Sequence, residues 1–116
     1  MSIAGTDAIT SVLGTALDGL SQRQNVIADN IANVDTPGFR ATSVDFESSL
    51  ASAISSGNLN AATVSTTPTD TPVGADGNNV DLRKETMAAV QSQYQYQVLT
   101  RAVNDRFNRL RDSLGS

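Results

Sequence analysis

The residues best suited to binding a metal ion are crowded into one short stretch, residues 76–81, which reads Asp-Gly-Asn-Asn-Val-Asp. Carboxylate and amide oxygens at this spacing are typical of a calcium-binding loop. The stretch lacks the glycine that such a loop needs at its sixth position, and Met87 stands where the closing glutamate belongs. The sequence therefore predicts a turn here and no metal site.

Other residues that could perform catalysis are scarce. The chain has no histidine, which removes the commonest general base and the commonest metal ligand, and it has no cysteine, which excludes disulfides. Lys84 is the only lysine, and no serine or threonine near it has the spacing of a nucleophile paired with a base. We therefore expect a protein that is not an enzyme, with no catalytic, cofactor-binding or metal-binding residues.

The elements that carry these residues begin with a long amphipathic helix, predicted over residues 7–34. Its apolar residues recur at alternating intervals of four and three, interrupted only by the polar Gln24, which is the rhythm of a coiled coil. Gly14 and Gly19 each weaken such a helix by about 1 kcal/mol relative to alanine, so packing must compensate. The predicted packing residues of this helix are Leu13, Leu17, Leu20, Ile27, Ile31 and Val34.

The chain is predicted to turn directly after this helix. Residues 36–39 read Thr-Pro-Gly-Phe, which places proline second and glycine third, as a type II turn requires. Residues 35–54 are therefore predicted to form a turn and a short segment, in which Val44, Phe46, Leu50 and Ile54 could belong to the start of a strand followed by a helix. Residues 55–79 are rich in Ser, Thr, Asn and Gly, so they are predicted to form a flexible loop.

A second long helix is predicted over residues 80–114, with Asp81 as its N-cap. Its main packing stripe consists of Tyr96, Leu99, Val103, Phe107, Leu110 and Leu114. An adjacent apolar stripe consists of Met87, Val90, Tyr94 and Val98, and this breadth implies more than one packing partner. A polar stripe consists of Gln93, Gln97, Arg101, Asn104, Asn108 and Arg111. On its own, such a stripe could simply face solvent.

Together these elements predict an all-α fold in a single domain, residues 1–116. The two long terminal helices are expected to pair as an antiparallel, coiled-coil-like hairpin around an irregular middle. Leu, Ile, Val and Phe make up only 27 of the 116 residues, which is a thin supply for a self-sufficient core. We therefore expect neighbouring molecules to complete the burial of the helices, although an ordinary core within one chain remains the alternative.

The charge and hydropathy of the chain argue against several partners. The net charge of −4 does not favour nucleic acid. No apolar stretch approaches the roughly 18 residues that a membrane-spanning helix needs, so direct membrane insertion is not expected. The N-terminal residues lack the basic and apolar regions of a cleavable signal peptide.

Residues 30–39, Asn-Ile-Ala-Asn-Val-Asp-Thr-Pro-Gly-Phe, match without departure the N-terminal signature N-I-A-N-x-D-T-P-G-[FY]. The chain thereby resembles the bacterial flagellar basal-body rod protein family. Its short length and the helix start at residues 79–82 make it most similar to the proximal rod members. The motif turn comprises Asn30, Asn33, Asp35, Thr36, Pro37, Gly38 and Phe39. Its polar side chains could bond across subunits or to their own turn.

The resemblance implies a structural, self-assembling subunit of the proximal rod, the tube that transmits torque for motility and surrounds the export channel. In such a tube the polar stripe from Gln93 to Arg111 could line a wet channel. The implied partners are other rod subunits in a helical homo- or hetero-oligomer, membrane-ring and rod-adapter proteins, and the flagellar type III export gate. The implied location is the periplasmic rod of the basal body, reached from the cytoplasm by type III export without signal cleavage. Phe46 and Leu50 fit the family's export-recognition pattern, although they could equally be buried anchors.

Two alternatives stay open from the sequence. The chain could be the other kind of short proximal rod subunit, but the E-M-V-x-M and R-x-Y-x-A-N runs typical of its C-terminal helix are absent. It could also be a small secreted helical-hairpin effector or an export chaperone. Secreted hairpins of that kind carry a Trp-x-Gly turn, and this chain has no tryptophan.

Overall fold

The computed structural model describes residues 3–115, with side chains described from residue 8 onward. Met1, Ser2 and Ser116, which the predicted domain includes, lie outside the described residues. The molecule is elongated, measuring 64 × 27 × 14 Å. Its radius of gyration is 17.8 Å, whereas a compact domain of this length has about 13 Å. The shape is that of a rod-like subunit with a small sheet beside it.

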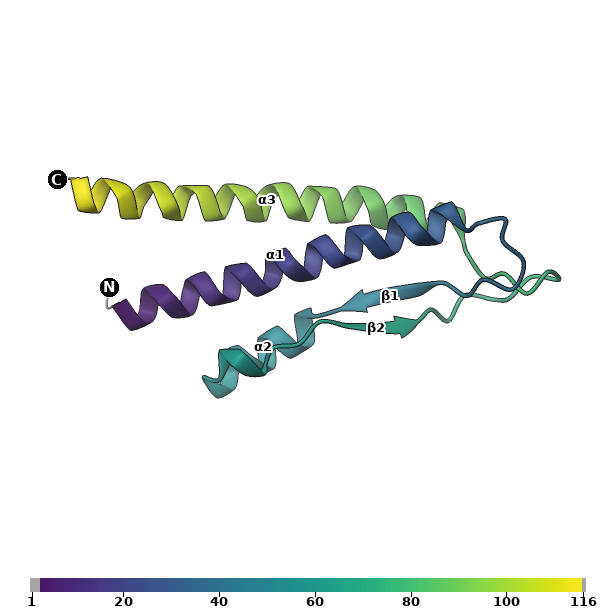
Figure 1. Cartoon of the computed structure of the whole chain (residues 1–116), viewed down its shortest axis with the longest axis horizontal. Helices are drawn as coiled ribbons and strands as arrows, with labels where there is room; N and C mark the ends of the chain where they lie inside the picture. The colour runs from purple at the N-terminus through teal and green to yellow at the C-terminus, as the bar shows by residue number, and fades with distance from the viewer. Residues whose placement is uncertain (1–2, 116) are drawn as a thin grey trace.

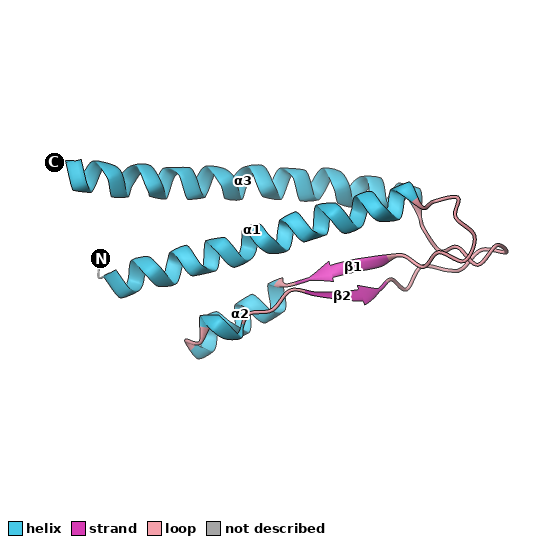
Figure 2. Cartoon of the chain, in the orientation of Figure 1, coloured by secondary structure: helices cyan, strands magenta, loops and turns pink. Residues whose placement is uncertain are grey.

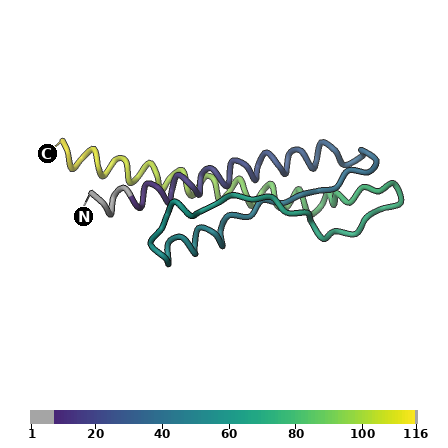
Figure 3. The backbone as a smooth tube through the Cα atoms, turned by 60° about the horizontal axis from the view of Figure 1, so that its bottom comes forward, coloured from purple at the N-terminus to yellow at the C-terminus, as the bar shows by residue number. Residues whose placement is uncertain are grey.

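Two long helices run antiparallel along the molecule and contact each other, as Figures 1 and 3 show. Helix α1 spans Ile3–Ala32, and helix α3 spans Leu82–Gly115. In Figure 1 they lie close together near the loops and draw apart toward the chain termini. The predicted pairing of two terminal helices is confirmed. Helix α1 begins earlier than residue 7 and ends two residues before Val34, because the chain enters a turn at Asn33.

The middle of the chain is more regular than the predicted all-α layout with an irregular segment. Strand β1, Thr42–Asp45, pairs antiparallel with strand β2, Ser65–Pro68, and helix α2, Glu47–Ser56, lies between them in sequence. A short 3-10 turn, Leu59–Ala61, leads toward β2. Figure 2 shows the two strands in magenta beside α1. Composition alone predicts a loop here, but the β-branched threonines of β2 favour a strand once β1 offers a partner.

The buried apolar residues gather in one part of the molecule. Leu20 of α1, Val44 of β1 and Phe46 form one packed cluster, which Leu50 and Leu99 flank. The remaining buried apolar residues are Ile27, Ala41 and Ala53. The accessible surface is 7684 Å², whereas a compact monomer of this mass exposes about 6,000 Å². The core within one chain is therefore small, and much apolar surface stays exposed.

No helix within residues 3–115 combines the length and the apolar character that crossing a bilayer requires.

Candidate assembly surfaces

The end of the hairpin near the loops is closed by polar bonds, and we call it the stapled end: residues 19–47 together with residues 65–85. Its first contact is a close fit between Phe46 and Gly19. A Cβ atom on Gly19 would lie only 2.5 Å from two carbons of the Phe46 ring. Only glycine leaves room for the ring against α1, so Gly19 is a slot for Phe46. Phe46 is consequently 5% exposed.

Arg23, one turn further along α1, lies over the face of the same ring. Its guanidinium lies 4.9 Å from the Phe46 ring centroid, a distance at which a cation attracts an aromatic face. Arg23 Nη2 also donates to the Val44 carbonyl at 2.7 Å and to the Glu47 carboxylate at 2.9 Å. The hydrogen bond from Arg23 lowers the pKa of Glu47 below its ordinary value of 4.5. Arg23 thus ties α1 to β1, to Phe46 and to the start of α2.

Asn30 joins α1 to the edge of β1. Its Nδ2 donates to the Thr42 carbonyl at 2.8 Å, and its Oδ1 accepts from the Thr42 N–H at 3.3 Å. An amide side chain here takes the place that a neighbouring strand would occupy. Asn30 is only 1% exposed, so losing these bonds would leave buried polar groups without partners.

The motif turn folds as predicted at its centre. Gly38 has a φ of +78°, and the Phe39 N–H donates to the Thr36 carbonyl at 3.2 Å, both of which a type II turn requires. Asn33 bonds back to the Asp29 carbonyl at 2.8 Å and accepts from the Thr36 hydroxyl at 3.1 Å. These bonds join the turn to the end of α1 and close it on itself, all within this chain. Asp35, Pro37 and the turn's outer surface are exposed.

Asn78 fastens this turn to the loop that precedes α3. Its Nδ2 donates to the carbonyls of Asn33 and Thr36, both at 2.8 Å, and its Oδ1 accepts from the Val80 N–H at 2.7 Å. The neighbouring Gly77 has a φ of +82°, and a Cβ atom there would lie 3.2 Å from the Gly38 Cα. The two loops touch through these glycines because no side chain stands between them.

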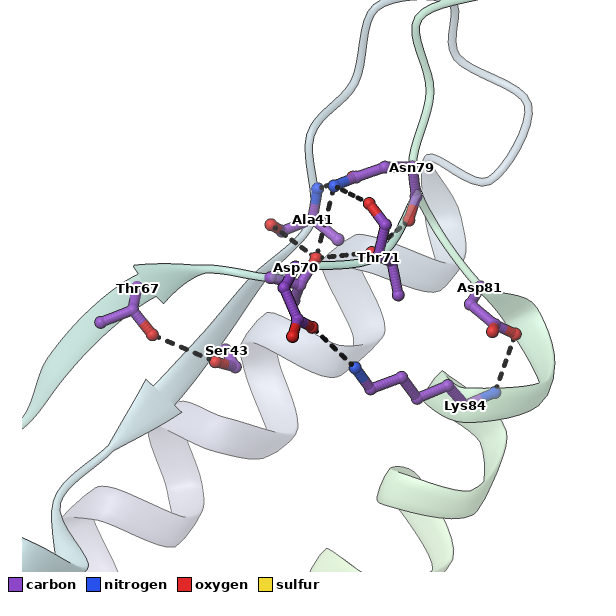
Figure 4. A network of polar contacts seen from close by, with 9 residues as sticks. Ala41, Ser43, Thr67, Asp70, Thr71, Asn79, Asp81 and Lys84 are labelled. Atoms are coloured by element: carbon purple, nitrogen blue, oxygen red, sulfur yellow. Dashed lines mark hydrogen bonds and ion pairs between the residues drawn. The ribbon is translucent and has the colours of Figure 1, made fainter. Parts of the chain in front are cut away.

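Asn79 completes the junction, as Figure 4 shows. Its Oδ1 accepts from the Ala41 N–H at 2.6 Å, and its carbonyl accepts from the Thr71 hydroxyl at 2.7 Å. The stretch that resembles a calcium loop therefore directs its amide side chains to backbone groups of this chain. At its end, Asp81 Oδ1 accepts from the Lys84 N–H at 3.1 Å, which confirms the predicted N-cap.

The opposite end of the hairpin is different, and we call it the open end: residues 8–18 of α1 and residues 100–115 of α3. A groove of about 440 Å³ lies between the two helices there. Its apolar lining consists of Leu13, Leu17, Val103, Phe107 and Leu110. Phe107 is 67% exposed, and Leu110 and Leu114 are exposed as well. The predicted packing residues are therefore present here without enough of the chain to cover them.

The chain is similar to known proteins over most of its length. A family model described as "Flagella basal body rod protein" matches residues 11–40. FlgB of Bacillus subtilis is 37% identical, over 88% of this chain and 89% of its own length. FlgB of Escherichia coli is 31% identical over 95% of each chain, and FlgB of Borreliella burgdorferi is 33% identical over 72% and 78%.

The chain belongs to the FlgB family of flagellar basal body rod proteins. It is a structural subunit of the rod and not an enzyme. Membership of this family excludes both alternatives left open by the sequence. These were the other proximal rod subunit (FlgC) and the secreted effector or chaperone. The region that the family model matches, residues 11–40, extends from the open end of α1 through the motif turn.

The FlgB-family packing stripe on α1 divides between the two ends. Leu20 and Ile27 are buried within the chain, so a charge there would disrupt the subunit itself and would not test contacts between subunits. Leu13, Leu17, Ile31 and Val34 are half-buried.

The stripe on α3 divides in the same way. Leu99 and Val103 are half-buried, whereas Tyr96, Phe107, Leu110 and Leu114 are exposed. The adjacent apolar stripe of Met87, Val90, Tyr94 and Val98 is exposed throughout. The polar stripe is likewise exposed at each of its residues from Gln93 to Arg111.

Of the two residues of the Phe-x-x-x-Leu pattern, Phe46 belongs to the stapled end and Leu50 lies just beyond it, in α2. Phe46 is buried in its slot, and Leu50 of α2 is half-buried against the same cluster. The pattern Phe-x-x-x-Leu thus anchors the start of α2 to α1 in the folded chain.

The sequence does not single out four residues that organise the stapled end: Gly19, Arg23, Asn78 and Asn79. Gly19 reads locally as a weak point in a helix, and Arg23 reads as part of its solvated face. Asn78 and Asn79 lie in the stretch that resembles a calcium loop, for which the sequence predicts a turn and no metal site. Their backbone partners are not visible in the sequence. The one available signal is the pair of adjacent asparagines directly before a helix, which is typical of residues that bond a turn.

Proposed function

We propose that this rod subunit assembles through its open end, where a helix of a neighbouring rod subunit fills the groove between α1 and α3. The observation that supports this is the exposure of Phe107 and Leu110, which line the groove together with Leu13, Leu17 and Val103. A contiguous apolar surface of this kind on a soluble chain marks an interaction site. Burial against a neighbour supplies the apolar contacts that one chain lacks.

Charge favours contacts between unlike faces of neighbouring subunits. The open end of α1, residues 8–18, carries Asp18 and no base. The open end of α3, residues 100–115, carries an excess of bases, with Arg101, Arg106, Arg109 and Arg111 against Asp105 and Asp112. Arg106 and Arg109 line the groove and lie off the polar stripe, so they are the bases that Asp18 of a neighbouring subunit would meet. Contact between these unlike surfaces suits a head-to-tail, heterologous interface, which propagates a helical assembly.

The exposed stripe of Met87, Val90, Tyr94 and Val98 serves as a second contact, toward a different neighbour. Its residues lie on the half of α3 that belongs to the stapled end or adjoins it, away from the groove. The polar stripe from Gln93 to Arg111 then faces the central export channel. Amide and guanidinium groups there offer a passing unfolded chain a wet surface to which apolar side chains do not adhere.

As a member of the proximal rod, the chain adjoins membrane-ring and rod-adapter proteins and the type III export gate, and it reaches the periplasmic rod by that export route. Phe46 and Leu50 act as the recognition residues for export. Because Phe46 is buried after folding, recognition acts on the chain before its core forms. Phe46 and Leu50 thus bind the export gate first and anchor α2 to α1 after folding.

The assembly proposal is tested by Phe107→Asp, which places a charge in the groove without touching the stapled end. We expect the variant to be exported and to keep the helical circular dichroism of the parent, and to lose rod assembly and motility. The matched control is Asn108→Asp, which adds the same charge on the exposed polar stripe. Rods formed normally by Phe107→Asp would contradict the groove as an assembly site.

The export proposal is tested by secretion assays on Leu50→Ala, with Ile54→Ala as the control. Both residues lie in α2, but Ile54 is exposed and falls outside the Phe-x-x-x-Leu pattern. We expect secretion to fall for Leu50→Ala alone. Equal secretion of both variants would contradict recognition at Leu50.

A further inference from the structure

The small sheet has one edge that this chain closes and one that it leaves open. The Thr69 N–H donates to the Ala41 carbonyl at 3.1 Å, just beyond the ends of the strands. The pairs of β1 and β2 continue the same register, with Ser43 opposite Thr67 and Val44 opposite Thr66. Hydrogen-bonded pairs alternate with non-bonded pairs in an antiparallel sheet. The backbone groups of Ser43 and Thr67 therefore point inward, and those of Val44 and Thr66 point outward.

Side chains of α1 bond three of the four outward groups of β1. Asn30 bonds both the N–H and the carbonyl of Thr42, and Arg23 bonds the carbonyl of Val44. These are the positions that the alternation assigns to the outer edge of β1. No further strand can join β1 from this side.

The outward groups of β2 remain unpaired. These groups are the N–H and carbonyl of Thr66 and the carbonyl of Pro68, and within residues 3–115 no third strand joins the sheet. All four residues of β2 are exposed, and in Figure 2 the strand lies on the side of β1 away from α1. Pro68 fits this edge because its missing N–H would point outward. An exposed strand edge is a template for pairing with another chain.

We propose that β2 accepts an extended strand from a different protein of the basal body, by addition of a third strand to the sheet. A second copy of this chain does not fit this role. Within the described residues the outer edge of β2 is the only free strand edge. Two copies could therefore pair only by placing the β2 edge of one against the β2 edge of the other. Such pairing is two-fold and isologous, whereas the subunits of a rod share one polarity and meet through unlike surfaces.

The edge also defines the chemistry of its partner. The partner strand needs β-branched residues opposite the Ser and Thr side chains of β2. Asp70 follows the strand with a fully exposed side chain, and its ion pair with Lys84 is long, at 3.8 Å. A lysine or arginine at the adjoining end of the partner strand would therefore meet an available carboxylate.

The test uses Thr66→Pro, which removes the outward N–H and leaves the inward bonds of β2 to β1 in place. Thr66→Val is the matched control, because it keeps the N–H and changes only the side chain. Both variants are expressed as the full chain in flagellated cells in place of the parent. We expect Thr66→Pro to lower the number of completed rods about tenfold, and Thr66→Val to have little effect.

Hydrogen exchange gives a second measurement that does not depend on the folding of a variant. The peptide containing Thr66 and Thr67 should exchange at least about tenfold more slowly in isolated basal bodies than in the free parent chain. A photo-crosslinker placed at Thr66 should join a protein other than this chain, and Thr66→Pro should abolish the same contact from position 65.

Three results would overturn the proposal. They are unchanged exchange in basal bodies, crosslinks from Thr66 to a second copy of this chain, and an equal loss of rods in both variants. Normal rods with Thr66→Pro would also count against the edge while leaving assembly through the groove intact, since Phe107→Asp tests that groove separately.

Discussion

At the stapled end, buried asparagines and one arginine join α1, the small sheet and α3 into a single body. At the open end the same two helices separate around an apolar groove, and their large side chains face outward. The stapled end contains Asn30, Asn78 and Phe46, each buried and bonded or packed to distant parts of the chain. The open end contains Leu13, Phe107 and Leu114, for which one chain supplies too few partners.

The difference shows two separate requirements on a subunit of this family: a fixed conformation and a surface for a neighbour. One half of the molecule fixes the conformation with directional bonds, and the other half exposes apolar side chains, where we propose that a neighbour binds. A subunit built in this way can hold its shape weakly before assembly and strongly after it, because the missing burial arrives with the neighbour.

The largest expected effect is a difference in the free energy of unfolding between alanine variants of two phenylalanines, one at each end of the molecule. Phe46→Ala should lower the free energy of unfolding by about 3–5 kcal/mol, because it empties the slot at Gly19. Phe107→Ala, at the open end, should change it by less than about 0.5 kcal/mol. Urea unfolding followed by circular dichroism measures both. Similar losses in the two variants would mean that stability is spread over the whole hairpin.

The second test removes one staple. Asn78→Ala should lower the free energy of unfolding by about 2–3 kcal/mol, since the carbonyls of Asn33 and Thr36 and the Val80 N–H lose their partner. Asn60→Ala, at an exposed position, serves as the control. A loss no larger than that of the control in urea unfolding would show that water replaces Asn78 at the junction.

Two glycines of α1 should respond to alanine with opposite signs. Gly19→Ala should lower the free energy of unfolding by about 2 kcal/mol, because its Cβ would meet the Phe46 ring at 2.5 Å. Gly14→Ala should raise it by about 1 kcal/mol, because Gly14 has open space around it and alanine favours a helix. Thermal unfolding of the two variants checks the signs, and a gain in both would disprove the close fit at Gly19.

The smallest expected effect concerns pH. Because the folded chain lowers the pKa of Glu47, this carboxylate contributes stability above its unfolded pKa, and the contribution is lost as the pH falls through the folded pKa. The Glu47 side chain is more than half exposed, so the contribution should be about 0.2–1 kcal/mol. Urea midpoints of the parent and Glu47→Gln should differ at pH 7 and converge below pH 4.5. Midpoints that differ equally at both pH values would assign the effect to packing.

The sequence predicts the two helices, the turn at Gly38 and the N-cap at Asp81, because each depends on residues that lie close together in the chain. It does not predict strand β2, because β2 pairs with residues 20 or more positions away in β1, and β1 is itself bonded to Asn30 and Arg23 of α1. It also does not predict the slot at Gly19, whose partner Phe46 lies 27 positions further along the chain. Local periodicity thus identifies elements, and the contacts that close the stapled end depend on their spatial arrangement.

Both long helices leave the stapled end and run to the same end of the molecule, where α1 begins and α3 finishes (Figure 1). A force that pulls the start of α1 away from the end of α3 would separate the two helices one turn at a time, beginning at the groove. The asparagine junction would bear the force last. A load applied along the tube by neighbouring subunits would instead pull the two helices in parallel, and all their lateral contacts would resist it together.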